Sequence, residues 1–66
     1  MIVTVNGGDV DVDDGATVAD LLQHLGLAKR VVAVERNLEP VDRRDLATTR
    51  LAPGDRLEIA RAVAGG

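Results

Sequence analysis

The sequence predicts a small α+β domain in which one main helix packs across a mixed β-sheet of four or five strands. Three observations support this class. A hairpin signature opens the chain, where "MIVTV" and "VDVD" flank "NGGD". An amphipathic helical pattern follows in "TVADLLQHLG". Two further strand-like runs, "VVAVER" and "RLEIA", complete the chain. Its 66 residues suffice for one domain, so we assign residues 1–66 to a single unit.

The predicted hairpin has one buried and one solvated face. "VDVD" alternates strictly, so Val10 and Val12 are expected to face the core while Asp9, Asp11 and Asp13 face water. The intervening "NGGD" contains the residue types that tolerate positive φ in a tight turn.

The helix carries both a start and a stop signal. Thr17 with Asp20 three residues later forms a capping-box pattern. Gly26 is placed to end the helix, with Leu27 beyond it as the apolar contact of a glycine C-cap. The buried stripe recurs at helical spacing: Val18, Leu21, Leu22 and Leu25.

After the helix, the sequence predicts a strand, an irregular segment and a final strand. A third strand is predicted from Val31 to Arg36, and its continuous apolar start favours a central position in the sheet. Pro40 cannot donate to a ladder, so "NLEPV" is predicted to be a turn with a short edge segment. Asp42 is placed to cap one helical turn.

The last strand is predicted to lead directly into the C-terminal residues. Pro53 and Gly54 form the centre of a turn, and in "RLEIA" Leu57 and Ile59 are expected to point inward. The resulting order of elements is that of the ubiquitin-like β-grasp. Fold alone does not give function.

Composition narrows the function classes. The chain has no cysteine and no Phe, Tyr or Trp, so its core must be aliphatic and no disulfide can help to stabilise it. The net charge is -3, and all eight Lys and Arg residues lie between Lys29 and Arg61. This charge and the lack of aromatic side chains argue against nucleic-acid binding. The N-terminus lacks a signal-peptide pattern and no run is long enough to span a membrane, so we expect a cytoplasmic protein.

Catalytic chemistry is not supported by the residues present. One histidine, His24, is predicted on a solvated flank of the helix, and no phosphate-binding glycine motif occurs. The acidic residues near the N-terminus alternate along a strand and turn, and their spacing does not match a calcium loop. We therefore expect neither a catalytic residue nor a bound metal or cofactor.

The C-terminal stretch "RAVAGG" is the candidate functional segment. We predict that residues 61–66 form a flexible tail, because two glycines without Cβ can pass through a slot too narrow for other residues. A terminal carboxylate is a poor electrophile and must be converted to a mixed anhydride with AMP before sulfur or an amine can attack it. A protein that carries a group on its terminal carboxylate would need no catalytic residues of its own, because partner enzymes would activate that carboxylate.

The motifs "VVAVERN" and "PGDRLEIARAVAGG" closely resemble the ThiS family of sulfur carriers in thiamine thiazole synthesis. The resemblance implies that an E1-like, ATP-dependent enzyme adenylates Gly66, that a thiocarboxylate forms there, and that thiazole synthase receives the sulfur. It also implies that the partners grip the segment before it: Gly65, Ala64, Val63, Ala62 and Arg61. Some members have an aromatic or bulky apolar residue a few positions before the glycines, where this chain has Arg61 and Ala62.

Alternatives share the fold. The small subunit of molybdopterin synthase has the same ending but is usually longer. It tends to place prolines just before the terminal glycines, whereas "EIARAVAGG" contains none. A ubiquitin-like modifier would share the activation step and end in an isopeptide bond. A β-grasp interaction module would have a merely frayed end.

As a docking hypothesis, the activating enzyme contacts the outer side of the last strand and the tail, and the protein alone is a monomer. The residues concerned are Arg56, Glu58, Ala60, Arg61 and Val63.

Overall fold

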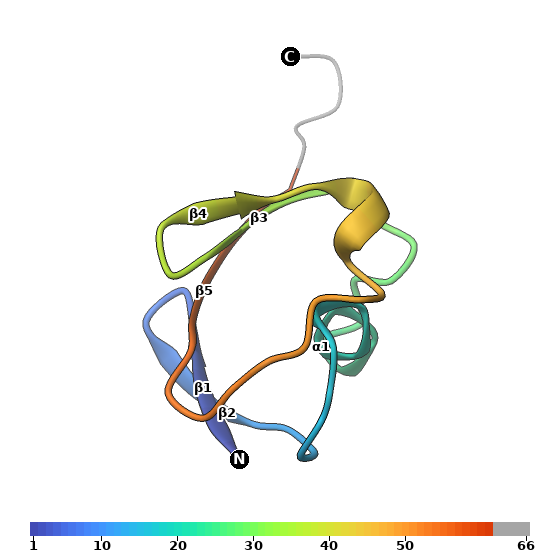
Figure 1. Cartoon of the computed structure of the whole chain (residues 1–66). Coiled ribbons are helices and arrows are strands. Elements are labelled where there is room, and N and C mark those ends of the chain that lie inside the picture. Colours follow the sequence, from blue (N-terminus) through green and yellow to red (C-terminus); the bar gives the residue numbers. More distant parts are fainter. Residues whose placement is uncertain (62–66) are drawn as a thin grey trace.

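The computed structural model describes residues 1–61, and their strands form one five-stranded mixed sheet in the order β2-β1-β5-β3-β4. The elements are β1 (Ile2–Val5), β2 (Gly8–Asp11), α1 (Val18–His24), β3 (Val32–Arg36), β4 (Glu39–Val41), the 3₁₀ turn η1 (Arg43–Asp45) and β5 (Arg56–Arg61). β1 runs parallel to β5, and the other neighbouring pairs are antiparallel. The helix lies across one face of the curved sheet (Figure 1). This is the predicted ubiquitin-like β-grasp arrangement.

The first hairpin turns through Asn6 and Gly7, whose φ angles are 49° and 85°. Val5 pairs with Gly8 across this two-residue loop, as in a type I′ turn. Val12 is buried and Val10 packs against the core, while the aspartates of this region are exposed. The predicted hairpin and its two faces are therefore confirmed.

Both predicted ends of α1 are present. The Thr17 side chain accepts from the Asp20 N–H at 3.1 Å, and the Asp20 carboxylate accepts from the Thr17 N–H at 2.9 Å. At the other end Gly26 has a φ of 75°, and the Leu27 N–H donates to the Leu22 carbonyl at 2.7 Å. This pattern of bonds satisfies the free N–H and C=O groups at both ends of a seven-residue helix.

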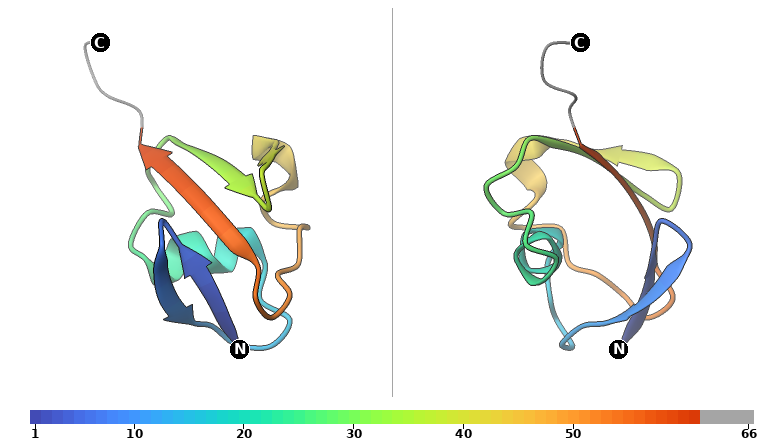
Figure 2. Two further views of the ribbon diagram at one scale, coloured as in Figure 1. Left: turned by 90° about the vertical axis from the view of Figure 1, so that its left-hand side faces the viewer. Right: turned by 180° about the vertical axis from the view of Figure 1, so that it is seen from behind.

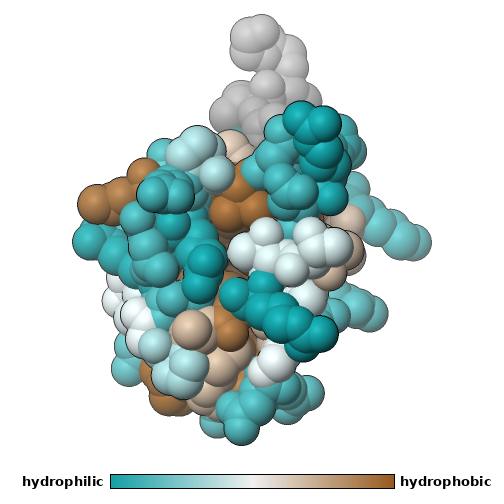
Figure 3. Space-filling view, viewed as in Figure 1, coloured by the Kyte–Doolittle hydropathy of each residue, from teal (hydrophilic) through white to brown (hydrophobic). Residues whose placement is uncertain are grey.

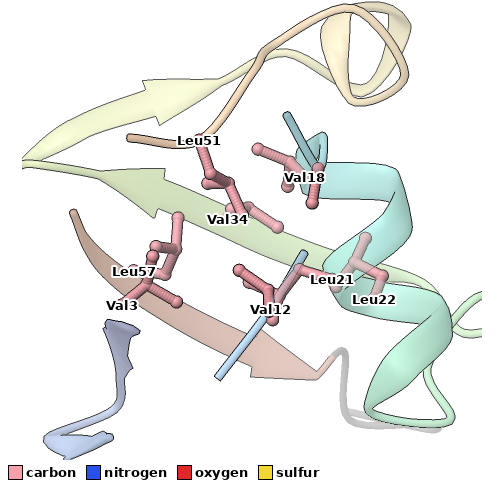
Figure 4. Close-up of a cluster of buried hydrophobic side chains, with 9 residues drawn as sticks. Val3, Val12, Val18, Leu21, Leu22, Val34, Leu51 and Leu57 are labelled. Atoms are coloured by element: carbon pink, nitrogen blue, oxygen red, sulfur yellow. The ribbon is translucent and has the colours of Figure 1, made fainter. Parts of the chain in front are cut away.

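The core is formed by aliphatic side chains from both layers, which point toward one another in Figure 4. Val3, Val18, Leu21 and Leu57 are fully buried, and Leu22 is 4% exposed. Leu25 and Ile59 are half-buried and pack against this cluster. The remaining buried hydrophobic residues are Val12, Ala16, Val34 and Leu51.

The third predicted strand differs in detail from expectation. β3 begins at Val32 and not at Val31, the predicted first residue. Val31 lies before the strand and is 61% exposed. β3 is an interior strand, but the middle of the sheet is β5. Only one face of β3 is buried: Val34 packs in the core, while Ala33 and Glu35 are exposed. A continuous apolar run therefore does not imply burial on both faces here.

The segments after β3 follow the prediction. β4 is an edge strand containing Pro40, where the missing N–H breaks no inner ladder. Asp42 caps η1 by accepting from the Arg44 N–H at 3.0 Å. Gly54 has a φ of 82°, which fits the predicted turn before β5.

The face of the molecule seen in Figure 3 is mostly hydrophilic, with scattered apolar patches. Among the described residues the exposed large hydrophobic side chains are those of Ile2, Val31 and Leu38. No helix within residues 1–61 has the length and apolar character needed to cross a membrane.

Candidate functional site

The candidate site is the end of β5, because this strand leads to the C-terminal glycines. Arg61 is the last residue of β5, is exposed, and pairs with Val32 of β3. The other predicted tail residues lie outside the described residues: Ala62, Val63, Ala64, Gly65 and Gly66. The structure places Arg61, the last described residue, at the end of the middle strand of the sheet (Figure 2).

The start of β5 is held by a buried carboxylate that the sequence did not single out. Asp55 is 6% exposed. Its carboxylate accepts from the Ala52 N–H at 2.7 Å, from Arg36 Nε at 2.8 Å and from Asn37 Nδ2 at 3.1 Å. Asn37 in turn accepts from the Arg56 N–H at 2.9 Å. These bonds join the turn before β5 to the end of β3.

The pKa of Asp55 reflects this environment. Burial disfavours the charged carboxylate and raises its pKa, but the hydrogen bonds from Ala52, Arg36 and Asn37 and the Arg36 charge outweigh burial. The pKa of Asp55 is therefore lowered below its ordinary value of 3.8. The ionised carboxylate stabilises the fold at neutral pH.

The middle of β5 is held on its other side by Asn6. Its side chain accepts from the Ile59 N–H at 2.8 Å and donates to the Ile59 carbonyl at 3.0 Å. The Asn6 backbone N–H donates to the Leu57 carbonyl at 2.9 Å. Asn6 thereby continues the parallel pairing with β5 past the last residue of β1. The Asp55 network at the start of β5 and Asn6 at its middle therefore hold the strand at two points.

The outer face of the sheet near the end of β5 carries the described residues of the docking hypothesis. Arg56 and Ala60 are exposed and Glu58 is half-buried, and Arg56 Nε lies 3.3 Å from Glu58 Oε1. The strand register places Ala33 opposite Ala60 and Glu35 opposite Glu58. Ala33 and Glu35 could not be assigned to this face from the sequence, because local patterns do not determine the register between distant strands.

The region around His24 offers no stronger site. A depression of about 390 Å³ beside α1 is lined by His24 and by acidic residues of the segment that follows β2. Within residues 1–61, however, no three His, Asp or Glu side chains are placed to hold one metal ion. His24 is exposed at the end of α1, as predicted.

Comparison with solved structures shows close similarity over the whole length. A crystal structure of the thiamine biosynthesis protein ThiS from Geobacter metallireducens has a TM-score of 0.83 and 35% identity, with 100% of both chains covered. The crystal structure of SAMP1 from Haloferax volcanii has a TM-score of 0.62 and 28% identity, covering 98% of this chain and 97% of that one.

Curated relatives include two longer proteins. The chain is 41% identical over 66 residues to a thiazole synthase of Paramagnetospirillum magneticum, and 35% identical to a thiazole synthase of Magnetococcus marinus. It spans 20% of the length of each.

The family comparison covers the candidate segment as well as the sheet. The model of the ThiS family matches residues 3–66, which includes β5 and the terminal glycines. Because this match extends over nearly the whole chain, and because the ThiS structure has the same fold, the chain belongs to the ThiS family.

Proposed function

We propose that this protein is a sulfur carrier of thiamine biosynthesis, with the sulfur bound at the carboxyl group of Gly66. The observation that supports this most is that the ThiS family match continues through the two terminal glycines. The similar ThiS structure, itself that of a thiamine biosynthesis protein, also covers the whole chain.

The proposed chemistry proceeds through an acyl adenylate. An E1-like enzyme transfers AMP from ATP to the Gly66 carboxylate and releases pyrophosphate. A sulfur nucleophile then forms a C–S bond at this carbon, the C–O bond to AMP breaks, and a thiocarboxylate remains. The thiocarboxylate supplies the sulfur atom of a thiazole ring.

In this proposal the partner enzymes carry out all catalytic steps. ATP is bound by the activating enzyme, and this chain binds no cofactor and acts as a carrier rather than an enzyme. What it contributes is a folded surface and the segment from Arg61 to Gly66. The hydrogen bonds of Asp55 and Asn6 support this role, because they fix the position of β5, the strand that ends at Arg61.

Thiazole synthase is the proposed acceptor. Its support comes from the two longer relatives, which are thiazole synthases and match all 66 residues of this chain over part of their own length. We place the reaction in the cytoplasm, with the carrier a monomer when it is alone.

The test is the intact mass of the protein after incubation with ATP, a sulfide source and the E1-like enzyme. We expect a gain equal to the replacement of one oxygen by sulfur, localised to the C-terminal peptide. A variant that lacks Gly66 should fold normally, as judged by circular dichroism, and show no gain. No gain in the full chain with an enzyme that activates another carrier would refute the proposal.

A further inference from the structure

The outer face of the sheet is free of other described elements, because α1 covers the opposite face (left view of Figure 2). On this outer face, β3 and β5 bring together two pairs of residues. Ala33 lies opposite Ala60, and one step along the ladder on the same face Glu35 lies opposite Glu58. We call this part of the surface the Glu35–Glu58 notch.

Two glutamates directly opposite each other on one face repel and destabilise a sheet. Arg56 offsets part of this, since its Nε lies 3.3 Å from Glu58 Oε1, but both side chains are partly exposed. Within residues 1–61, Glu35 has no ion-pair partner. Glu35 therefore carries a negative charge that no ion pair within residues 1–61 compensates.

The notch is also hollowed. A depression of about 280 Å³ is lined by Asn6, Ala33, Glu35, Glu58, Ile59 and Ala60. Its floor is low because the side chains of Ala33 and Ala60 are small. Asn6 forms a fixed wall, because both ends of its amide are bonded to the backbone of Ile59. A flat side chain can lie on this floor between the two carboxylates.

The position of the notch connects it to the candidate segment. Ala60 immediately precedes Arg61, the last described residue of β5. An enzyme that acts on Gly66 must hold the residues that lead to it, so it approaches this end of the sheet. The following inference rests on the proposed function in this respect.

We propose that the notch receives an arginine side chain of the activating enzyme, whose guanidinium group bridges Glu35 and Glu58. Arginine fits better than lysine, because its planar fork can donate to two carboxylates at once. Its aliphatic stem would lie over Ala33 and Ala60. The row of charges from Arg56 through Glu58 and the guanidinium to Glu35 then alternates in sign, and the repulsion between the glutamates is relieved.

The first test measures adenylation kinetics for Glu35→Gln, Glu58→Gln and the double variant. We expect the KM for the carrier to rise about tenfold in the double variant with little change in kcat, since docking is weakened and the reacting end is unchanged. The dependence of KM on salt should also become weaker. The control is Asp9→Asn, which removes one negative charge from the exposed strand β2 on the same face. Its KM should stay within about twofold.

Thermal unfolding separates docking from a structural role. Relief of the repulsion predicts that the double variant is at least as stable as the original chain, so a lower melting temperature would contradict the inference. An unchanged KM and salt dependence, in an enzyme that does activate the chain, would also overturn it while leaving the carrier function intact.

A second probe needs no enzyme. N-acetyl-arginine amide is titrated into the protein, and the backbone amide signals of Ala33, Glu35, Glu58 and Ala60 are followed by NMR. We expect these signals to shift with arginine, to shift less with N-acetyl-lysine amide, and not to shift in the double variant. If the chain proves not to be activated at all, this titration alone decides whether the notch binds a guanidinium group. Equal shifts in the double variant would exclude it.

Discussion

At the scale of single residues, two side chains have roles that their type alone does not reveal. Asp55 is a buried acid in a chain whose other acids are largely exposed. The side-chain amide of Asn6 bonds the N–H and the carbonyl of Ile59, in place of the backbone groups of a further strand residue. Each works through several hydrogen bonds to residues distant in sequence. Asn6 lies in the first turn, as its sequence context predicts, and Asp55 directly follows the predicted turn centre at Pro53 and Gly54. Their additional bonds depend on strands that meet only in the folded sheet.

The Asp55 network predicts a dependence of stability on pH. Asp55→Asn should lower the free energy of unfolding by about 1 to 3 kcal/mol at pH 7, because buried donors lose a charged acceptor. The lowered pKa means that the ionised carboxylate stabilises the fold above the unfolded value of about 3.8, and that this contribution is lost as the pH falls through the folded pKa. The difference between the two proteins should therefore shrink below that pH. Urea unfolding from pH 7 to pH 2 measures it.

The control for Asp55 is Asp13→Asn, which removes an exposed carboxylate. Its stability should stay within about 0.5 kcal/mol of the original at neutral pH. A constant difference for Asp55→Asn at all pH values would show that charge plays no part.

At the scale of elements, local signals predicted the hairpin, the helix and both of its caps. "NGGD", the Thr17 to Asp20 box and Gly26 each act over a few residues, so sequence alone was sufficient. The strand β3 was harder. Its apolar run gave its existence and interior place, but not the exposure of Val31 or the outward position of Ala33 and Glu35. These depend on the pairing of β3 with β5, which is separated from it by about twenty residues of chain.

The end of β5 gives a prediction about activation. Arg61→Glu reverses a charge at the exposed first residue of the candidate segment. If the activating enzyme contacts Arg61, as proposed, adenylation should slow by about fivefold, since a charge at the rim of an interface mainly affects association. The release of pyrophosphate measures the rate.

The matched control is Arg44→Glu in η1, an exposed arginine on another element. Its rate should be unchanged. Equal slowing in both variants would point to the net charge of the molecule rather than to contact at Arg61.

At the scale of the whole molecule, the chain forms its core without any aromatic side chain. Among residues 1–61, nine buried aliphatic residues make up this core. A domain of this size has a stability of roughly 3 to 10 kcal/mol. The loss of one large buried side chain therefore endangers the entire fold, and this too could be predicted from the composition.

Leu22→Ala should lower the free energy of unfolding by about 2 to 5 kcal/mol, because it leaves a cavity between α1 and the sheet. Leu22 is 4% exposed. Leu38→Ala makes the same change at a residue that is 74% exposed, and should alter stability by less than about 0.5 kcal/mol. Thermal or urea unfolding of the two variants compares them. Similar stabilities would show that Leu22 is not packed as described.

The central place of β5 has a consequence for synthesis of the protein. β1 and β3 do not pair with each other, and only β5, the last described strand, joins the two hairpins. While the chain is being translated, the ribosome must release the segment Arg56–Arg61 before the sheet can close. A chain without β5 has no strand to join these two hairpins, and it cannot present the assembled sheet to a partner.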